Sequence, residues 1–243
     1  MMNLKKLSLS LVFTGLLMAQ TTVRADIVEA FTGGQLSTPG WSNGIGADAS
    51  IYLSTAAPDA TYGIALSESQ WSYNTNISFL PGETLSAWIN PGPTPTADNN
   101  AQGGRLFVGF DAGANGAQSF VAASDTSQLG FQDNTGYATP NFSNSVAQTY
   151  QDQWYYLTIA LSADGSTATA SLYDMDGKTL LSSLTETGLS AATDNGIALR
   201  GSGAAAITSI AITAVPVPGA IWMFASAMGL FGFVAKRRKT NLI

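Results

Sequence analysis

The stretch that decides the fold spans residues 154–184 and reads WYYLTIALSADGSTATASLYDMDGKTLLSSL. Apolar and polar side chains alternate through its first eight residues, a period of two that is typical of a β-strand. One face of that strand carries Tyr155, Leu157, Ile159 and Leu161. Asp-Gly pairs at 164–165 and 176–177 separate three such runs, and glycine supplies the positive φ that a tight hairpin needs. The stretch therefore predicts a three-strand antiparallel meander.

Further segments with the same alternation lie on both sides of this meander. In 105–110, for example, Leu106, Val108 and Phe110 share one face. The other predicted strands are 51–53, 62–66, 76–80, 84–90, 118–123, 128–132, 167–173, 178–184, 196–200 and 206–214. Long connections rich in Gly, Asn and Thr lie at 91–104, 111–117 and 133–141. Loops of that length usually join different sheets, which favours a sandwich over a simple barrel.

No stretch between Asp26 and Val215 shows two capped turns of helical periodicity. We therefore expect an all-β domain over residues 26–214, built as a two-sheet antiparallel sandwich of the jelly-roll type.

Composition removes most catalytic chemistry. The 243 residues include no Cys and no His. This excludes Ser-His-Asp and Cys-His nucleophiles, thiolate or imidazole metal sites and disulfides. Residues 26–215 hold three basic residues against all sixteen acidic ones, a net charge of −13. Such a domain repels phosphate backbones, so we expect no nucleic-acid partner.

The amino-terminal residues 1–25 have the pattern of a secretory signal peptide. Lys5 and Lys6 precede an apolar stretch at 7–19, and Val23-Arg24-Ala25 offers small residues at the two positions that signal peptidase reads. The mature chain would then begin at Asp26. An uncleaved membrane helix is the alternative, but the apolar stretch is short for a bilayer.

The carboxyl-terminal residues 215–243 carry a second membrane signal. The nineteen residues 217–235 are uncharged and would span about 28 Å as a helix, close to the thickness of a hydrocarbon core. The basic run that follows holds its end in the cytoplasm by the positive-inside bias. That run is Lys236, Arg237, Arg238 and Lys239. With an exported amino terminus, the acidic domain would lie outside the cytoplasmic membrane.

This tail resembles a known family of sorting signals. A short proline motif comes first, followed by the apolar span and the basic run. The motif consists of Val215, Pro216, Val217, Pro218 and Gly219. It is similar to the Val-Pro-Leu-Pro-Ala variant of the PEP-CTERM signal of Gram-negative bacteria. The resemblance implies processing by an exosortase-type membrane protease and delivery to the cell surface or the extracellular polysaccharide matrix. An ordinary single membrane anchor is the alternative.

The domain resembles laminin-G-like and concanavalin-A-like jelly rolls. The segments that carry this resemblance are 84–91 (TLSAWINP), 154–157 (WYYL), 170–177 (ASLYDMDG) and 196–200 (GIALR). It implies a domain that binds sugars, calcium or other proteins, while some relatives are glycosidases. Fold alone does not choose among these activities.

Catalytic carboxylates are not indicated. Glycosidase relatives place two Glu and an Asp at alternating positions of one strand, for nucleophilic attack and protonation. The Glu residues after position 25 are Glu29, Glu68, Glu83 and Glu186, and none has an acidic residue two positions away. A Ser-Lys dyad is also disfavoured, because the only Lys of this region, Lys178, follows a hairpin turn. We expect no catalytic residues and no enzymatic activity.

Calcium is the one cofactor that the sequence leaves open. Asp174 and Asp176 stand in a fragment of a calcium-loop pattern that lacks a third oxygen ligand and the distal Glu. Weaker candidates are Asp98, Asn99, Asn100, Asp111, Asp133 and Asn134. Asp and Asn in loops also cap turns, so no metal ligand is assigned.

A sugar site would need exposed aromatic rings. Trp154 and Tyr156 lie opposite the face of Tyr155, so they form a stacking platform if exposed, or pack beneath a loop if buried.

We therefore expect an exported, non-enzymatic surface or matrix protein with a binding or structural jelly roll. The first alternative is a carbohydrate-binding lectin-like module, and the second is a glycoside hydrolase. Expected partners are signal peptidase, an exosortase, the membrane and extracellular polysaccharide.

Overall fold

The computed structural model describes residues 26–31, 36–42, 50–52, 57–58, 63–66, 71–95, 103–189, 194–203 and 205–214. All of them belong to one compact unit, Ala25–Val215. They form strands, turns and loops, and none of them lies in a helix that could span a bilayer. The predicted signal peptide and the predicted sorting tail lie outside the described residues.

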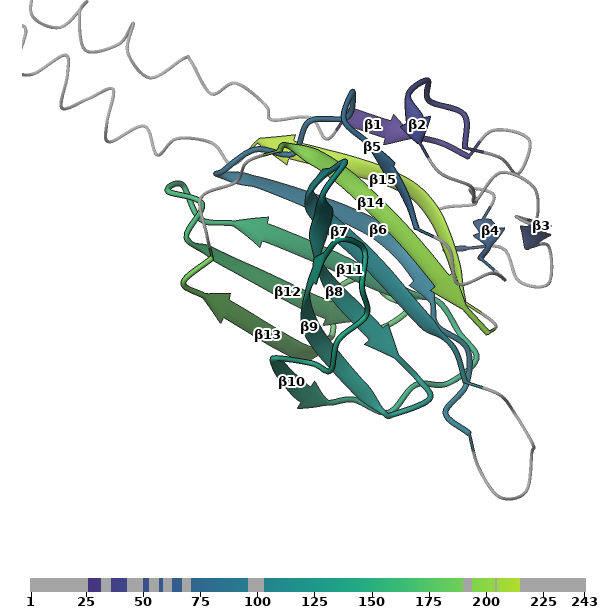
Figure 1. The fold of residues 1–243 in the computed structure, drawn as a ribbon. Helices are drawn as coiled ribbons and strands as arrows, with labels where there is room; N and C mark the ends of the chain where they lie inside the picture. Colours follow the sequence, from purple (N-terminus) through teal and green to yellow (C-terminus); the bar gives the residue numbers. More distant parts are fainter. Residues whose placement is uncertain are drawn as a thin grey trace, which may run out of the picture. The chain divides into compact units, whose positions relative to one another are not determined.

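In the described part of the chain, fifteen strands form two antiparallel sheets that pack face to face (Figure 1). The eight-stranded sheet contains β1 (Asp26–Glu29), β3 (Ser50–Tyr52), β4 (Gly63–Ala65), β6 (Glu83–Asn90), β11 (Tyr155–Leu161), β12 (Thr167–Tyr173), β13 (Leu180–Thr187) and β15 (Ala206–Ala214). The seven-stranded sheet contains β2 (Trp41–Ser42), β5 (Ser72–Asn74), β7 (Arg105–Gly113), β8 (Gly116–Ala123), β9 (Gln128–Thr135), β10 (Asn144–Ala147) and β14 (Gly196–Ser202). The predicted all-β sandwich is confirmed.

Strand order places the sequence-distant segments side by side. The eight-stranded sheet runs β13-β12-β11-β6-β15-β4-β3, with β1 paired to β15. The seven-stranded sheet runs β10-β9-β8-β7-β14-β5-β2. In each sheet a strand from the end of the domain, β15 or β14, pairs with a strand formed much earlier, β6 or β7. The long-range pairs make both sheets continuous.

The main core lies between the two sheets. One inner face presents Leu85, Ile89, Leu157 and Ile159, and the other presents Leu106, Val108, Phe120 and Leu129. All eight side chains are at most 1% exposed, and burying one such side chain contributes about 1.5–3 kcal/mol. The alternation predicted the inward residues of 105–110 and 155–161 correctly.

The predicted meander is present as β11, β12 and β13. Leu157 pairs with Leu172 and Ala170 with Leu184, so the inward faces of the three strands are in register. Gly165 and Gly177 adopt φ angles of 71° and 64° in the two turns, as the Asp-Gly pairs predicted. These turns fix which residues of β11 and β12 lie opposite each other on the outer face.

Several predicted boundaries are wrong for identifiable reasons. Residues 76–80 are not a strand: Ile77 and Phe79 point into the core, but the sheet strand is β5 at 72–74. The predicted loop 111–117 is largely strand, because an irregularity after Phe110 lets β7 and β8 continue to a two-residue turn. β9 extends into the predicted loop 133–141 and β13 begins later than predicted.

Candidate functional site

A row of three aromatic side chains crosses the outer face of the eight-stranded sheet. Trp88 of β6 lies directly opposite Tyr156 of β11, and Tyr156 lies directly opposite Tyr173 of β12. Their ring centroids are 5.0 Å and 6.3 Å apart. Each ring is half-buried. We call these three residues the aromatic row.

Small side chains surround the aromatic row on the same face. The residues two positions away along the strands are Ser86, Thr158 and Ser171, which lie opposite one another. The next positions hold Thr84, Ala160 and Thr169. β13 extends both sets with Ser183 and Thr185, whose hydroxyls lie 3.2 Å and 3.0 Å from those of Ser171 and Thr169. We call this array the hydroxyl rows, and it contains no charged residue.

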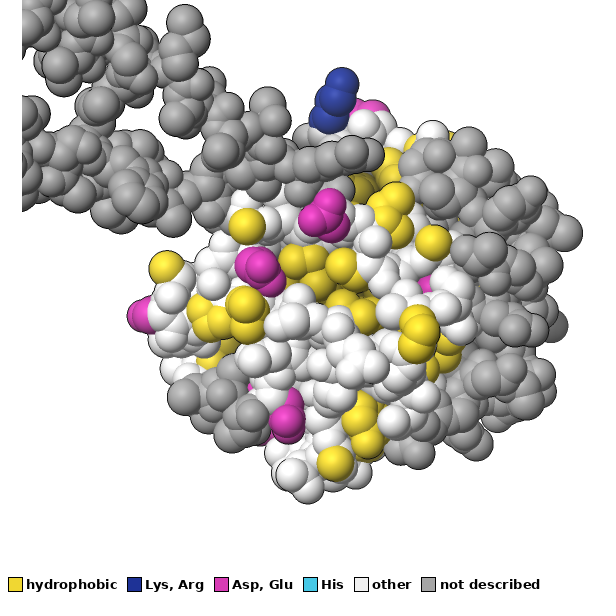
Figure 2. Space-filling model, turned by 90° about the horizontal axis from the view of Figure 1, so that it is seen from above, with side chains coloured by type: hydrophobic (Ala, Val, Ile, Leu, Met, Phe, Trp, Pro, Cys, Tyr) yellow, Lys and Arg dark blue, Asp and Glu magenta, His cyan; other side chains and the backbone are white. Residues whose placement is uncertain are grey.

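Alternation along the strands produces this face. Side chains of β6, β11 and β12 that do not enter the core must point outward, so the register of three strands decides which of them become neighbours. On the face that Figure 2 shows, charged side chains are sparse among uncharged and apolar ones, and the acidic side chains are scattered singly. Rings partly exposed among hydroxyls can stack on an apolar ligand face while the hydroxyls exchange hydrogen bonds with it.

The predicted partner of Tyr156 is not part of the exposed surface. Trp154 lies on the same side of the strand as Tyr156, as predicted, but it is only 1% exposed. The Trp154 ring packs against Ala57 and Ala206, and Trp88 packs against this cluster. Gly63 of β4 lies against the Trp154 ring. A Cβ at this position would come within 2.7 Å of the ring, so only glycine fits there. The platform interpretation is wrong for Trp154, and burial, the other alternative, holds.

The calcium candidates Asp174 and Asp176 cap the turn between β12 and β13. The Asp176 carboxylate accepts hydrogen bonds from the backbone N–H groups of Lys178 and Thr179 and from the Thr179 hydroxyl. These bonds hold the pKa of Asp176 at about 2. Asp174 accepts from Gln153 Nε2 and from the Met175 backbone. Within the described ranges, no three acidic side chains come together.

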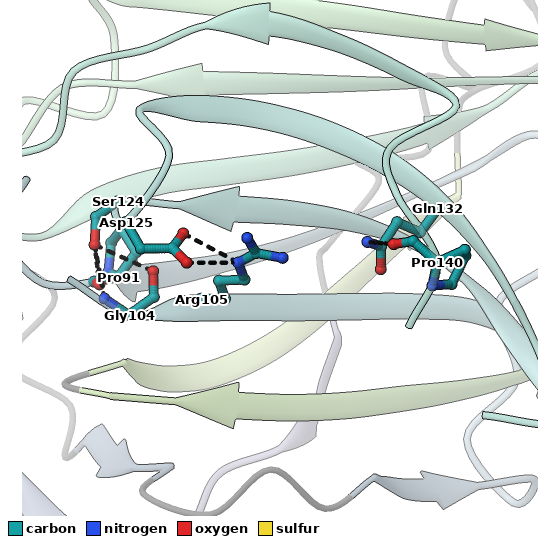
Figure 3. Close-up of polar contacts among 7 residues, drawn as sticks. All are labelled: Pro91, Gly104, Arg105, Ser124, Asp125, Gln132 and Pro140. Atoms are coloured by element: carbon teal, nitrogen blue, oxygen red, sulfur yellow. Dashed lines mark hydrogen bonds and ion pairs between the residues drawn. The ribbon is translucent and has the colours of Figure 1, made fainter. Parts of the chain in front are cut away.

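The opposite sheet carries a second feature on its outer face. Arg105, Thr126, Gln128, Gln132, Asn141, Phe142 and Ser145 line a depression of about 290 Å³. The Arg105 guanidinium lies 5.7 Å from the centre of the Phe142 ring, and its Nε donates to both carboxylate oxygens of Asp125 at 3.0 Å and 2.8 Å (Figure 3). Gln132 donates to the Pro140 carbonyl, which fixes the loop that carries Phe142 (Figure 3).

Away from this depression, aromatic rings cover the same face. Trp71 packs on Phe107 at 5.3 Å and on Tyr137 at 5.4 Å, and Tyr73 stacks on Tyr137 at 5.5 Å. The Tyr137 hydroxyl donates to the Gly113 carbonyl. This second apolar cluster is structural packing, since Trp71 is only 7% exposed.

The described glutamates have structural partners. Glu29 is 1% exposed and accepts hydrogen bonds from the backbone N–H of Phe31, from Ser37 and Thr38, and from Trp41 Nε1. Burial raises the pKa of Glu29, but the hydrogen bonds from Phe31, Ser37 and Thr38 lower it by more, so that the net shift is downward. Glu83 caps the preceding turn at the Leu80 N–H. Glu186 accepts a hydrogen bond from Asn144 Nδ2 at 3.1 Å. Each of the three described glutamates thus has a hydrogen-bond partner within the fold.

No protein-family model and no curated protein matches the sequence. The fold is similar to the VIP36 exoplasmic/lumenal domain. Its metal-free form gives a TM-score of 0.54 at 13% identity, covering 80% of this chain and 95% of that chain. Its Ca²⁺/Man3GlcNAc-bound form gives 0.53 at 13% identity, covering 78% and 88%. At this identity the similarity shows the fold alone: the domain is a two-sheet sandwich of the jelly-roll type.

Sequence reasoning found one member of the aromatic row and missed the other two. Trp88 and Tyr173 stand on separate strands, and only the register brings them to Tyr156. It also missed the depression, because the loop 136–143 folds back over β9 through side-chain contacts. Gly130 in the middle of β9 is a sequence signal for this loop, because a Cβ at that position would lie 2.5 Å from the Phe142 ring that packs on it.

Proposed function

We propose that this chain is a carbohydrate-binding protein of the cell surface or extracellular matrix, and that the aromatic row is its glycan-binding site. The observation that carries the proposal is the line of Trp88, Tyr156 and Tyr173 across three strands. Aromatic rings stack on the C–H faces of sugar rings, which are apolar, while sugar hydroxyls need polar partners. The hydroxyl rows supply such partners beside the stacking rings, with the exception of Ser86, which is buried.

The row suits an extended ligand better than a single sugar. Its three rings are aligned perpendicular to the strands, and neighbouring strands lie about 4.8 Å apart. A glycan chain lying along the row would place successive sugars over successive rings. The bound state of the similar VIP36 domain with Man3GlcNAc supports this choice of ligand class.

Export and sorting are part of the same proposal. The signal-peptide pattern at 1–25 and the tail at 215–243 would deliver the domain across the cytoplasmic membrane, with exosortase processing at the cell surface. A domain with a net charge of −13 and an uncharged ligand face suits a polysaccharide environment better than a nucleic acid.

Calcium has no step in the proposed binding. The VIP36 domain was determined in a Ca²⁺-bound form, but Asp174 and Asp176 in this chain are engaged in turn hydrogen bonds. The aromatic row and hydroxyl rows contain no carboxylate. Binding through these surfaces needs no ion, and the proposal includes no catalytic step.

The test is retention of the full chain, purified in detergent, in native gels that contain different polysaccharides. Tyr173→Ala removes the end ring of the row, and we expect it to lose retention that the unchanged protein shows. Tyr73→Ala is the matched control, since Tyr73 is also half-buried and stacks on one tyrosine, but on the opposite sheet. Addition of a calcium chelator should leave retention unchanged. Equal retention of the unchanged protein and Tyr173→Ala by every bound polysaccharide would contradict the proposal.

A further inference from the structure

The depression on the seven-stranded sheet is lined by one of the few basic side chains of the domain, Arg105, which is paired with Asp125. Its lining contains one cation, Arg105, with Thr126, Gln128, Gln132, Asn141, Phe142 and Ser145, and no acidic side chain. Residues 26–215 carry only three basic side chains against sixteen acidic ones. A second of those three, Arg200 of β14, lies close enough to Arg105 that burial and the Arg105 charge lower its pKa. Two of the three basic side chains of the domain therefore lie near each other on this face, and Arg105 is paired with Asp125.

The position of Arg105 is determined by contacts on two sides. Asp125 accepts hydrogen bonds from Nε only, and the Phe142 ring lies against the guanidinium. Ala123 of β8 pairs with Arg105 on one side and with Gln128 on the other, so only a small side chain lies between these two residues. Because these contacts order the side chain in the absence of ligand, less conformational entropy is lost when one binds.

The two terminal nitrogens of Arg105 are available for a ligand. They point away from Asp125 in Figure 3. Among the described residues, no hydrogen bond engages them, and the side chain is 31% exposed. A guanidinium presents these donors as a planar fork that matches the two oxygens of a carboxylate.

Uncharged polar groups surround this fork. Gln128, Asn141, Thr126 and Ser145 offer amides and hydroxyls, which are the partners that sugar hydroxyls require. The volume of about 290 Å³ is at the lower end of the range for small-ligand sites. The chemistry of the lining thus combines one carboxylate receptor with neutral hydrogen-bonding groups.

We propose that this depression is a second glycan site, specific for a carboxylate-bearing saccharide whose carboxylate binds the terminal nitrogens of Arg105. The site lies on the sheet opposite the aromatic row and does not depend on it. A protein with both sites can hold two polysaccharide segments on its two faces.

The experiment measures the affinity of the full chain in detergent for an oligogalacturonate and for a neutral cello-oligosaccharide of the same length. We expect Arg105→Gln to weaken oligogalacturonate binding about tenfold and to leave neutral binding within about twofold, since one charge-assisted contact is lost. Arg105→Lys keeps the charge without the fork and should fall between the two. Lys178→Gln, which removes an equal charge from the β12–β13 turn, should leave both affinities unchanged.

The outcomes separate the two proposals. Unchanged oligogalacturonate affinity in Arg105→Gln, or the same loss in Lys178→Gln, would overturn the carboxylate site. A sulfated dextran serves as a second anionic ligand. If the unchanged protein binds it but not the oligogalacturonate, and Arg105→Gln loses that binding, the site is not specific for carboxylates and the proposal is overturned as well. If Tyr173→Ala loses binding of the neutral cello-oligosaccharide and Arg105→Gln changes neither affinity, the aromatic row is supported as a glycan site and the Arg105 site is refuted. If Arg105→Gln weakens oligogalacturonate binding and Tyr173→Ala leaves binding of the neutral oligosaccharide unchanged, only the Arg105 site is supported.

Discussion

Replacing Tyr156, the central ring of the aromatic row, separates binding from folding. Tyr156→Ala removes one stacking position for a sugar, worth about 0.5–1.5 kcal/mol, so we expect the affinity for a bound glycan to fall about two- to tenfold. The same change removes the contacts with Trp88 at 5.0 Å and Tyr173 at 6.3 Å. Two lost aromatic pairs should cost about 1–3 kcal/mol of folding free energy.

That loss is smaller than the total stability of a typical domain, about 5–15 kcal/mol, so the variant should remain folded at 25 °C. Tyr156→Phe keeps the ring and should retain the affinity of the unchanged protein. Calorimetric titration with the best polysaccharide fragment from the retention test gives the affinity, and thermal unfolding gives the stability. Unchanged affinity in a folded Tyr156→Ala protein would refute the assignment of the row.

Three further predictions concern stability and processing. Trp154→Ala should lower the free energy of unfolding by about 3–5 kcal/mol, because the ring is 1% exposed, and calorimetric unfolding measures the loss. Glu29→Gln should cost about 1.5–3 kcal/mol in chemical denaturation at pH 7. Because the folded pKa of Glu29 lies below the ordinary 4.5, its contribution is present above pH 4.5 and disappears as the pH falls through the folded pKa, so acid should reduce the difference between the two proteins. Replacing Pro216 and Pro218 by Ala should block removal of the tail, and intact-mass analysis of surface material would then find residues 215–243 retained.

The inner faces of the strands followed from the sequence. Alternation in 105–110 and 154–161 identified the core residues because each strand buries one face, and a period of two leaves no other assignment. The Asp-Gly turns at 164–165 and 176–177 identified the hairpins for an equally local reason. These properties depend on neighbours within a few residues of the chain.

Strand ends did not follow from the sequence in the same way. Ile77 and Phe79 alternate like strand residues and are buried. Yet their segment joins no sheet, and the Phe79 N–H donates to the Asn195 carbonyl, just before β14. The Asn74 side chain accepts from the Asn76 N–H just after β5 and turns the chain there. Alternation reports burial, whereas a strand also requires a partner in register.

The candidate site shows the same division between local and long-range information. Alternation placed Trp154 and Tyr156 on one side of their strand, and both do lie there. What distinguishes them is the covering chain: Ala57 and Gly63, about a hundred residues away, lie over Trp154 and leave Tyr156 half-exposed. Trp88, 68 residues away, reaches Tyr156 only through the register of the sheet, whereas Tyr173, 17 residues away, reaches it through the hairpin between β11 and β12. A ligand surface on a sandwich is therefore a property of strand pairing, and a single strand can nominate one of its residues but not the others.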